Sequence, residues 1–292
     1  MLCQSHIRQL LAFSLGCLLT FFTNPAVSAD RKAIKAEQSR LLRDLLDQLF
    51  ELEHQIGKSN KETDLTPEFT VVKKAYEKIA QTLEPGTRLH LDKTLSKLKS
   101  KHSSPQELEQ TFYQLKQETI AAFKIDTAPP LSPNFELASA QYMEYCSSCH
   151  GNTGNGDGVL SKRLPKKPED FTSLQFSQKN SPLRTLNKLL VGSKQTGMPI
   201  FEHQLSNQDL WSISFYVQTL AYVPNNDSLN FESTLIKRGL NYSLLARLND
   251  DELLIWLSKN LNELNTTSKD AQKNIIASIR HHYSFSKNVP RR

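Results

Sequence analysis

Two cysteines and a histidine stand together near the middle of the sequence, where Cys146, Cys149 and His150 follow the order Cys-x-x-Cys-His. Two thiols three positions apart on one helical turn can form thioether bonds to the two vinyl groups of a haem, and the adjacent imidazole can ligate the iron. This pentapeptide is the attachment signature of c-type haem. It predicts one covalent haem c (heme c), attached at Cys146 and Cys149 and ligated by His150.

The other two cysteines, Cys3 and Cys17, lie in an N-terminal segment with the pattern of a secretory signal. An arginine precedes a short apolar core, and Val27-Ser28-Ala29 forms a small-residue cleavage site. The pattern predicts a signal peptide over residues 1–29 and a periplasmic protein, with an N-terminal anchor as the alternative if the segment is not cleaved. Lipid attachment at Cys17 does not fit, because Ser14 stands where a bulky aliphatic residue is needed.

After cleavage, Cys146 and Cys149 are the only thiols left, since the whole sequence has four cysteines. A disulfide framework and a second cysteine pair for a zinc site are therefore excluded. A thioredoxin-like redox pair is the remaining alternative for the two thiols. It expects a βαβ surrounding, which this sequence does not have.

The second axial ligand can be sought among the three methionines, of which Met1 would leave with the signal. Met143 lies three residues before the first haem-linking cysteine, on the side of the proximal ligand. Met198 stands between Gly197, which allows a close approach of the backbone to the haem, and a proline that stiffens the loop. A lone methionine is more often a core residue. Beside the haem motif, however, we expect Met198 to ligate the iron, with His203 as the alternative ligand.

Around these residues, the segment 134–224 has the pattern of a small all-α unit. Three helices are predicted in it, over residues 138–145, 183–191 and 210–220. Ser206 and Asp209 are spaced as the capping box of the third helix. Residues 151–158 are rich in Gly and Asn and suit a tight loop around a cofactor edge. A phosphate-binding loop is the alternative there, but it needs a preceding strand that is not apparent.

The segment resembles a class I c-type cytochrome domain, in which Cys146 and Cys149 would carry the haem and His150 and Met198 would ligate the iron. Further strings carry the resemblance: Gly-Asn-Gly-Asp-Gly at 154–158, Leu-Pro-Lys-Lys-Pro-Glu-Asp-Phe at 164–171, Gly-Met-Pro-Ile-Phe at 197–201 and Trp-Ser-Ile-Ser-Phe-Tyr-Val at 211–217. They are similar to the soluble cytochrome segment fused to some bacterial high-affinity iron permeases. The sequence lacks the membrane-spanning bundle and the Arg-Glu-x-x-Glu iron motif of those permeases, so it resembles their haem part alone.

Helical periodicity continues on both sides of this segment. Residues 30–126 carry four apolar stripes separated by prolines, which predict an antiparallel four-helix bundle domain. Residues 127–133 contain three prolines and are interpreted as a linker. Residues 225–292 are expected to form a helical C-terminal segment, in which Asn249 and Glu252 have the spacing of a capping box. The predicted fold class is therefore all-α.

Three other groups of side chains are candidates for function. Glu51, Glu53 and His54 could bind a metal at the rim of the bundle, although a solvated helix face is the more common explanation. His281 and His282 invite the same hypothesis, and exposure near a terminus is again the more common explanation. The net charge of +6 fits acidic redox partners or anionic membrane surfaces better than nucleic acid. A basic group that could dock such partners follows the glycine-rich loop, at Lys162, Arg163, Lys166 and Lys167.

Together these patterns predict a monohaem carrier of single electrons. A neutral imidazole and a soft thioether saturate the iron and leave no open position for a substrate. The expected partners are redox proteins, for example an iron permease, a membrane oxidase or a dehydrogenase. Two alternatives stay open: an accessory haem subunit for iron uptake that accepts electrons from ferrous iron, and an enzyme or gas sensor with a labile Met198. We also expect the haem segment to fold without its flanking helices.

Overall fold

The computed structural model describes residues 25–58, 65–99, 105–223, 232–261 and 268–282. Every regular element in these ranges is helical, apart from a single β-bridge between Ser193 and Met198. The predicted all-α fold class is confirmed. Within the same ranges, none of the helices combines the length and the apolar character that crossing a membrane requires.

The N-terminal part consists of four helices: α2 (Pro25–Lys58), α3 (Thr66–Ala80), α4 (Pro85–Lys99) and α5 (Pro105–Ala122). Prolines open three of them, because the first turn of a helix does not need the missing backbone N–H. Their apolar stripes meet in one core, which includes Leu45, Leu49, Val72, Ile79, Leu91 and Phe112. The cleavage site predicted after Ala29 falls in the first turns of α2, and the segment before α2 lies outside the described residues.

The middle part contains α6 (Phe135–Tyr145), α7 (Ser147–His150), a 3-10 helix (Ser161–Arg163), α8 (Leu174–Lys179), α9 (Pro182–Val191) and α10 (Asn207–Thr219). The three predicted helices are present, and the capping box of Ser206 and Asp209 is confirmed. Helix α8 was not among the predicted helices, because six residues are too few to show a helical period. α10 packs against both α6 and α9, so Trp211 and Tyr142 are almost fully buried.

The C-terminal part contains α11 (Glu232–Lys237), α12 (Tyr242–Arg247), α13 (Asp250–Asn260) and α14 (Lys269–His282). The capping box of Asn249 and Glu252 is confirmed at the start of α13. Asp250, at the first position of α13, accepts hydrogen bonds from the Tyr222 hydroxyl and from Arg280 of α14. The C-terminal helices are therefore joined to the end of the middle part by buried polar contacts.

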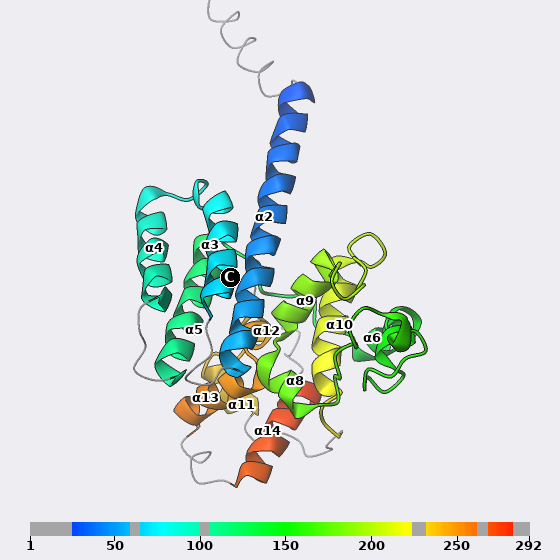
Figure 1. Cartoon of the computed structure of the whole chain (residues 1–292). Coiled ribbons are helices and arrows are strands. Elements are labelled where there is room, and N and C mark those ends of the chain that lie inside the picture. Colours follow the sequence, from blue (N-terminus) through cyan, green and yellow to red (C-terminus); the bar gives the residue numbers. More distant parts are fainter. Residues whose placement is uncertain (1–24, 59–64, 100–104, 224–231, 262–267, 283–292) are drawn as a thin grey trace, which may run out of the picture.

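The three parts share a second core, which differs from the core of the bundle. Leu46 and Phe50 of α2 belong to it, together with Tyr142, Trp211 and Leu253. α2 therefore has two apolar faces, one turned to the bundle and one to the middle part, and Figure 1 shows it standing between them. The segment expected to form a linker, 127–133, is bonded to α10, since Leu131 N donates to Gln208 Oε1 at 2.8 Å.

A buried lysine joins the bundle to the C-terminal helices. Lys116 of α5 is 2% exposed, and its Nζ lies 2.5 Å from Glu53 Oε1 and 2.7 Å from Glu252 Oε1. Burial alone would lower the pKa of Lys116, but the two carboxylates outweigh burial and raise it. An ammonium held between two carboxylates thus connects α2, α5 and α13.

Candidate functional site

Two consecutive helices position the Cys-x-x-Cys-His motif. α6 starts at the Asn134 cap and ends at Tyr145, and Cys146 leads directly into α7. The carbonyl of Cys146 accepts hydrogen bonds from the backbone N–H of Cys149 at 3.1 Å and of His150 at 2.9 Å. These bonds form the single turn that the spacing of the motif implies, and both half-buried thiols are free.

The glycine-rich loop folds back over this turn, as its composition predicted. Gly156 N donates to the His150 carbonyl at 2.8 Å, and Gly158 N donates to the Cys149 carbonyl at 3.2 Å. A Cβ atom on Gly158 would lie 2.6 Å from the Ser147 carbonyl oxygen, so a side chain cannot be accommodated there. The loop and the motif therefore form one tight unit.

The imidazole of His150 is held in one orientation. Its Nδ1 lies 3.1 Å from the carbonyl oxygen of Glu169, and its ring stacks on Phe171 with centroids 4.3 Å apart and planes 14° apart. Burial lowers the pKa of His150, although the Glu169 carbonyl opposes this effect. When Nδ1 donates its proton to that carbonyl, the lone pair of a neutral imidazole is on Nε2, which is the usual arrangement of a metal-binding histidine.

The chemistry of Cys146 argues against a thioredoxin-like redox pair. Burial, reinforced by the neighbouring Cys149, raises the pKa of the Cys146 thiol to about 12. Redox-active cysteines need a lowered pKa, because the thiolate is the reactive species. The structure has no strand beside the motif in the described ranges, so the βαβ surrounding of such a pair is missing as well.

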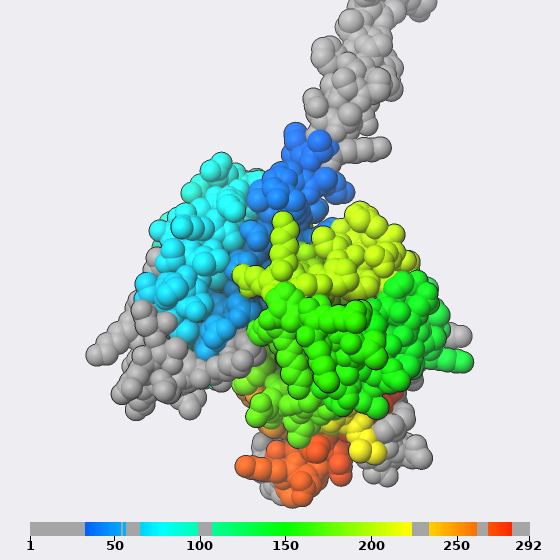
Figure 2. Space-filling model, turned by 45° about the vertical axis from the view of Figure 1, so that its right-hand side comes forward, coloured from blue at the N-terminus to red at the C-terminus, as the bar shows by residue number. Residues whose placement is uncertain are grey.

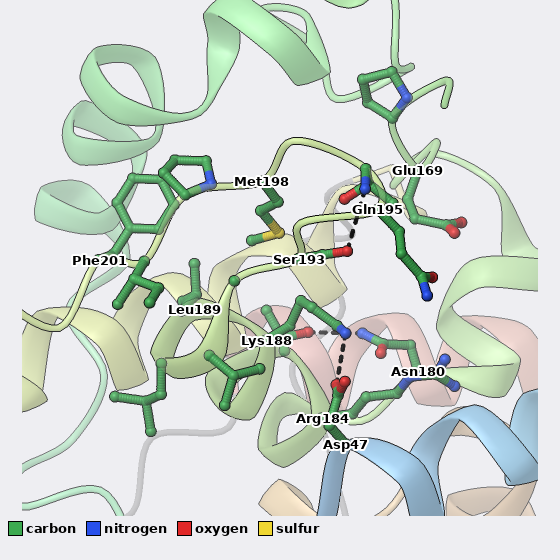
Figure 3. A pocket seen from close by; sticks show the side chains of 18 of the residues that line it. Asp47, Glu169, Asn180, Arg184, Lys188, Leu189, Ser193, Gln195, Met198 and Phe201 are labelled. Atoms are coloured by element: carbon green, nitrogen blue, oxygen red, sulfur yellow. Dashed lines mark hydrogen bonds and ion pairs between the residues drawn. The ribbon is translucent and has the colours of Figure 1, made fainter. Parts of the chain in front are cut away.

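Met198 lies on a loop that follows α9, which we call the methionine loop (residues 192–202). Ser193 N donates to the Met198 carbonyl at 2.9 Å within the loop, and Phe201 N donates to the carbonyl of Leu189 in α9 at 2.9 Å, so the C-terminal end of the loop is fixed to α9. Gly197 has a φ of +79°, which favours glycine directly before Met198. In Figure 3 the Met198 side chain points into the pocket.

The motif and the methionine loop line one cavity of 2410 Å³. Cys146, Cys149, His150 and Met198 all face it, and its apolar wall includes Leu160, Leu164, Phe171, Phe176, Leu189, Phe201 and Ile213. The volume exceeds the roughly 300–1,000 Å³ of ordinary small-ligand sites. Two thiols, a neutral imidazole and a thioether around an apolar cavity fit a covalently attached haem. Met143 is exposed and His203 is exposed, and neither lines this cavity.

α2 forms another part of the cavity wall, which the sequence analysis did not foresee. Arg40, Arg43 and Asp47 line the cavity from this helix, and Figure 2 shows α2, in blue, directly against the methionine loop, in yellow-green. Asp47 Oδ1 lies 2.5 Å from Lys188 Nζ of α9 (Figure 3). The sequence does show these charged residues beside the apolar stripe of α2. It does not show which helix they contact, so their place in the cavity wall could not be predicted.

The remaining candidates from the sequence are the two possible metal sites, at residues 51–54 and 281–282, and the basic group after the glycine-rich loop. Glu53 pairs with Lys116, and Glu51 Oε2 lies 3.9 Å from Arg184 Nη2. The described part of the chain contains no cluster of three His, Cys, Asp or Glu side chains that could hold a metal ion. The side chains of His54 and His282 lie outside the description, and His281 Nε2 lies 3.3 Å from the Tyr222 carbonyl.

The basic group after the glycine-rich loop is exposed, and two of its members line the cavity, namely Lys166 and Lys167.

Comparison with known proteins identifies the middle part. The family model described as Cytochrome c matches residues 135–221. No curated protein is significantly similar to the chain. Among solved structures, a chain of the "Kuenenia stuttgartiensis reducing HAO-like protein complex Kustc0457/Kustc0458" is 27% identical with a TM-score of 0.31, over 42% of this chain and 62% of that one. The match thus spans less than two thirds of that chain's length.

The protein therefore has a cytochrome c domain in its middle, flanked by helices on both sides. This family implies a covalent haem c and haem-based electron transfer. The Cys-x-x-Cys-His spacing of the chain agrees with that implication.

Proposed function

We propose that this protein is a periplasmic carrier of single electrons, with one haem attached at Cys146 and Cys149 and ligated by His150 and Met198. The observation that carries the proposal is that these four side chains line the same cavity. When bound, the haem supplies an iron that takes up and releases one electron. Saturation of the iron by an imidazole and a thioether favours electron transfer over substrate chemistry.

The surrounding residues have separate roles in this proposal. The Glu169 carbonyl would fix the tautomer of His150, so that the lone pair is on Nε2, and the stacked Phe171 ring would fix the plane of the imidazole. Gly197 lets the backbone turn directly before Met198, whose thioether also lines the cavity. The apolar side chains would surround part of a bound haem with a low local dielectric constant, which affects its reduction potential.

A basic rim marks where a redox partner would approach. Lys166 and Lys167 are exposed and line the cavity. Two more exposed basic residues, Lys162 and Arg163, precede them by four positions in the sequence. A positive rim attracts a partner with an acidic surface and speeds their encounter. We therefore propose an acidic redox protein as the partner, of which an iron permease, a membrane oxidase or a dehydrogenase would be examples.

Reversible redox titration of the purified holoprotein tests this function. We expect a single one-electron wave, and we expect the ferrous protein not to bind carbon monoxide, because both axial positions are filled. Binding of carbon monoxide by the unmodified ferrous protein would instead support the enzyme or gas-sensor alternative. The iron-uptake alternative requires a ferrous-iron site in the helical flanks, and none of the described residues provides a metal-binding cluster in its favour.

A further inference from the structure

Charged side chains join α2 to the methionine loop. Arg43 Nη1 lies 2.7 Å from Oε2 of Glu202, the last residue of the loop. The backbone carbonyl of Arg43 also accepts a hydrogen bond from Asn187 Nδ2 of α9 at 3.2 Å. One turn further along α2, Asp47 pairs with Lys188 of α9 at 2.5 Å. α2 therefore holds the loop and the helix that carries it at the same time.

A third pair of the same kind lies farther from the loop. Glu51 of α2 and Arg184 of α9 approach to 3.9 Å. Residues four apart lie on one face of a helix, so Arg43, Asp47 and Glu51 form a single charged row along α2. Their partners run in the opposite direction along α9, which places Arg43 at the loop end of the row and Glu51 at the far end.

We propose that the two pairs nearest the loop, Arg43 with Glu202 and Asp47 with Lys188, are a clamp by which α2 keeps the methionine loop closed, with Arg43 as a positioning residue for Met198. The inference rests on the proposed function, because it takes Met198 as an axial ligand. A backbone bond from Phe201 to the Leu189 carbonyl fixes the C-terminal end of the loop to α9. Arg43 pairs with the next residue, Glu202, so that α2 holds the same end of the loop from a second helix.

With a haem bound, such a clamp would limit how often the Met198 side chain moves away from the iron. An added ligand such as imidazole can bind ferric iron only while Met198 is detached, so its apparent dissociation constant varies inversely with the detached fraction. Imidazole binds in its neutral form. Removal of a nearby charge therefore has little direct electrostatic effect on imidazole binding, and a change in affinity reports the opening of the loop. A weaker clamp should then appear as tighter imidazole binding.

Imidazole titration of the ferric holoprotein tests the clamp through a graded set of variants. Arg43→Gln should tighten the apparent affinity by about fivefold, the scale expected for a partly exposed ion pair. Asp47→Asn should have a smaller effect, and Glu51→Gln should have none. The reciprocal exchange of Arg43→Glu with Glu202→Arg should restore the affinity of the wild type. Added salt should tighten imidazole binding in the wild type but not in Arg43→Gln.

A matched control on the same helix is Lys35→Gln, because Lys35 is exposed, does not line the cavity and should leave imidazole affinity unchanged. The clamp is overturned if Arg43→Gln leaves the affinity unchanged, or if Lys35→Gln or Glu51→Gln changes it equally. Absence of the thioether-to-iron absorption band from the wild-type ferric spectrum would overturn the ligation by Met198 and the clamp with it. An unchanged affinity in a protein that has the band overturns the clamp alone.

Discussion

The cytochrome c domain and helix α2 line the same cavity. The haem motif is shaped by contacts between residues close in sequence, whereas α2 reaches the cavity through contacts between residues far apart in sequence. Cys146, Cys149 and His150 are neighbours along the chain, and local hydrogen bonds shape their turn. Arg43 of α2 meets Glu202 across 159 positions of sequence. A local motif thus defines the chemistry of the cavity, whereas distant helices complete its wall. The two regions should consequently respond differently to substitution.

The largest effect is expected from Cys146→Ala combined with Cys149→Ala. The double variant should lose all covalent haem, which staining of a denaturing gel would show. Within the described ranges, the core of the N-terminal bundle contains no side chain from the cytochrome c domain. Its helices should therefore keep a cooperative thermal transition in circular dichroism. Haem staining that survives in the double variant would show that the attachment residues are wrong.

Lys116→Met should be the most destabilising single substitution outside the haem site. It leaves Glu53 and Glu252 close together without the ammonium between them. Loss of one partner from a buried ionic group costs about 3–5 kcal/mol, which urea unfolding would measure. Lys93→Met is the matched control, because Lys93 is exposed on α4 and should be nearly neutral. Equal stability of the two variants would contradict a structural role for Lys116.

The two faces of α2 can be compared directly through adjacent residues. Phe50 lies in the core shared with the cytochrome c domain, and Leu49 lies in the core of the bundle. Both alanine variants should lose about 2–5 kcal/mol of unfolding free energy. Phe50→Ala should also alter the absorption spectrum of the haem, whereas Leu49→Ala should not. Identical spectra for the two variants would show that α2 does not influence the cavity.

The smallest effect is expected from the titration of Glu202. The hydrogen bond from Arg43 holds the pKa of Glu202 below its ordinary value of 4.5, and burial opposes this only in part. A carboxyl group with a lowered pKa in the folded state stabilises that state above the ordinary pKa, and the contribution is lost as pH falls through the lowered value. The stability difference between wild type and Glu202→Gln should therefore be present at neutral pH and vanish in acid. A difference that is constant with pH would contradict the ion pair.

The sequence predicted the elements that have local signals. The helix caps at Ser206 and Asn249 are confirmed because a capping box depends on residues three positions apart. The tight loop after the haem motif is present because its glycines allow a close return of the backbone. Helix α8 escaped prediction because its six residues are too short for a period.

Long-range packing could not be predicted from the sequence alone. The apolar stripe that contains Leu46 and Phe50 does not identify the surface it will cover, since any apolar surface of suitable shape could bury it. The structure buries these side chains against the cytochrome c domain. α2 and the C-terminal helices thus supply part of the core of that domain, and its folding without these flanks stays a prediction.

The ferric absorption spectrum of the wild type and of Met198→Ala tests the central claim, which is that a covalent haem is ligated by His150 and Met198. The thioether-to-iron band near the red end of the spectrum should be present in the wild type and absent from Met198→Ala. His203→Ala should retain the band, because His203 does not line the cavity. A wild-type protein without the band, or a Met198→Ala variant that keeps it, would contradict the account.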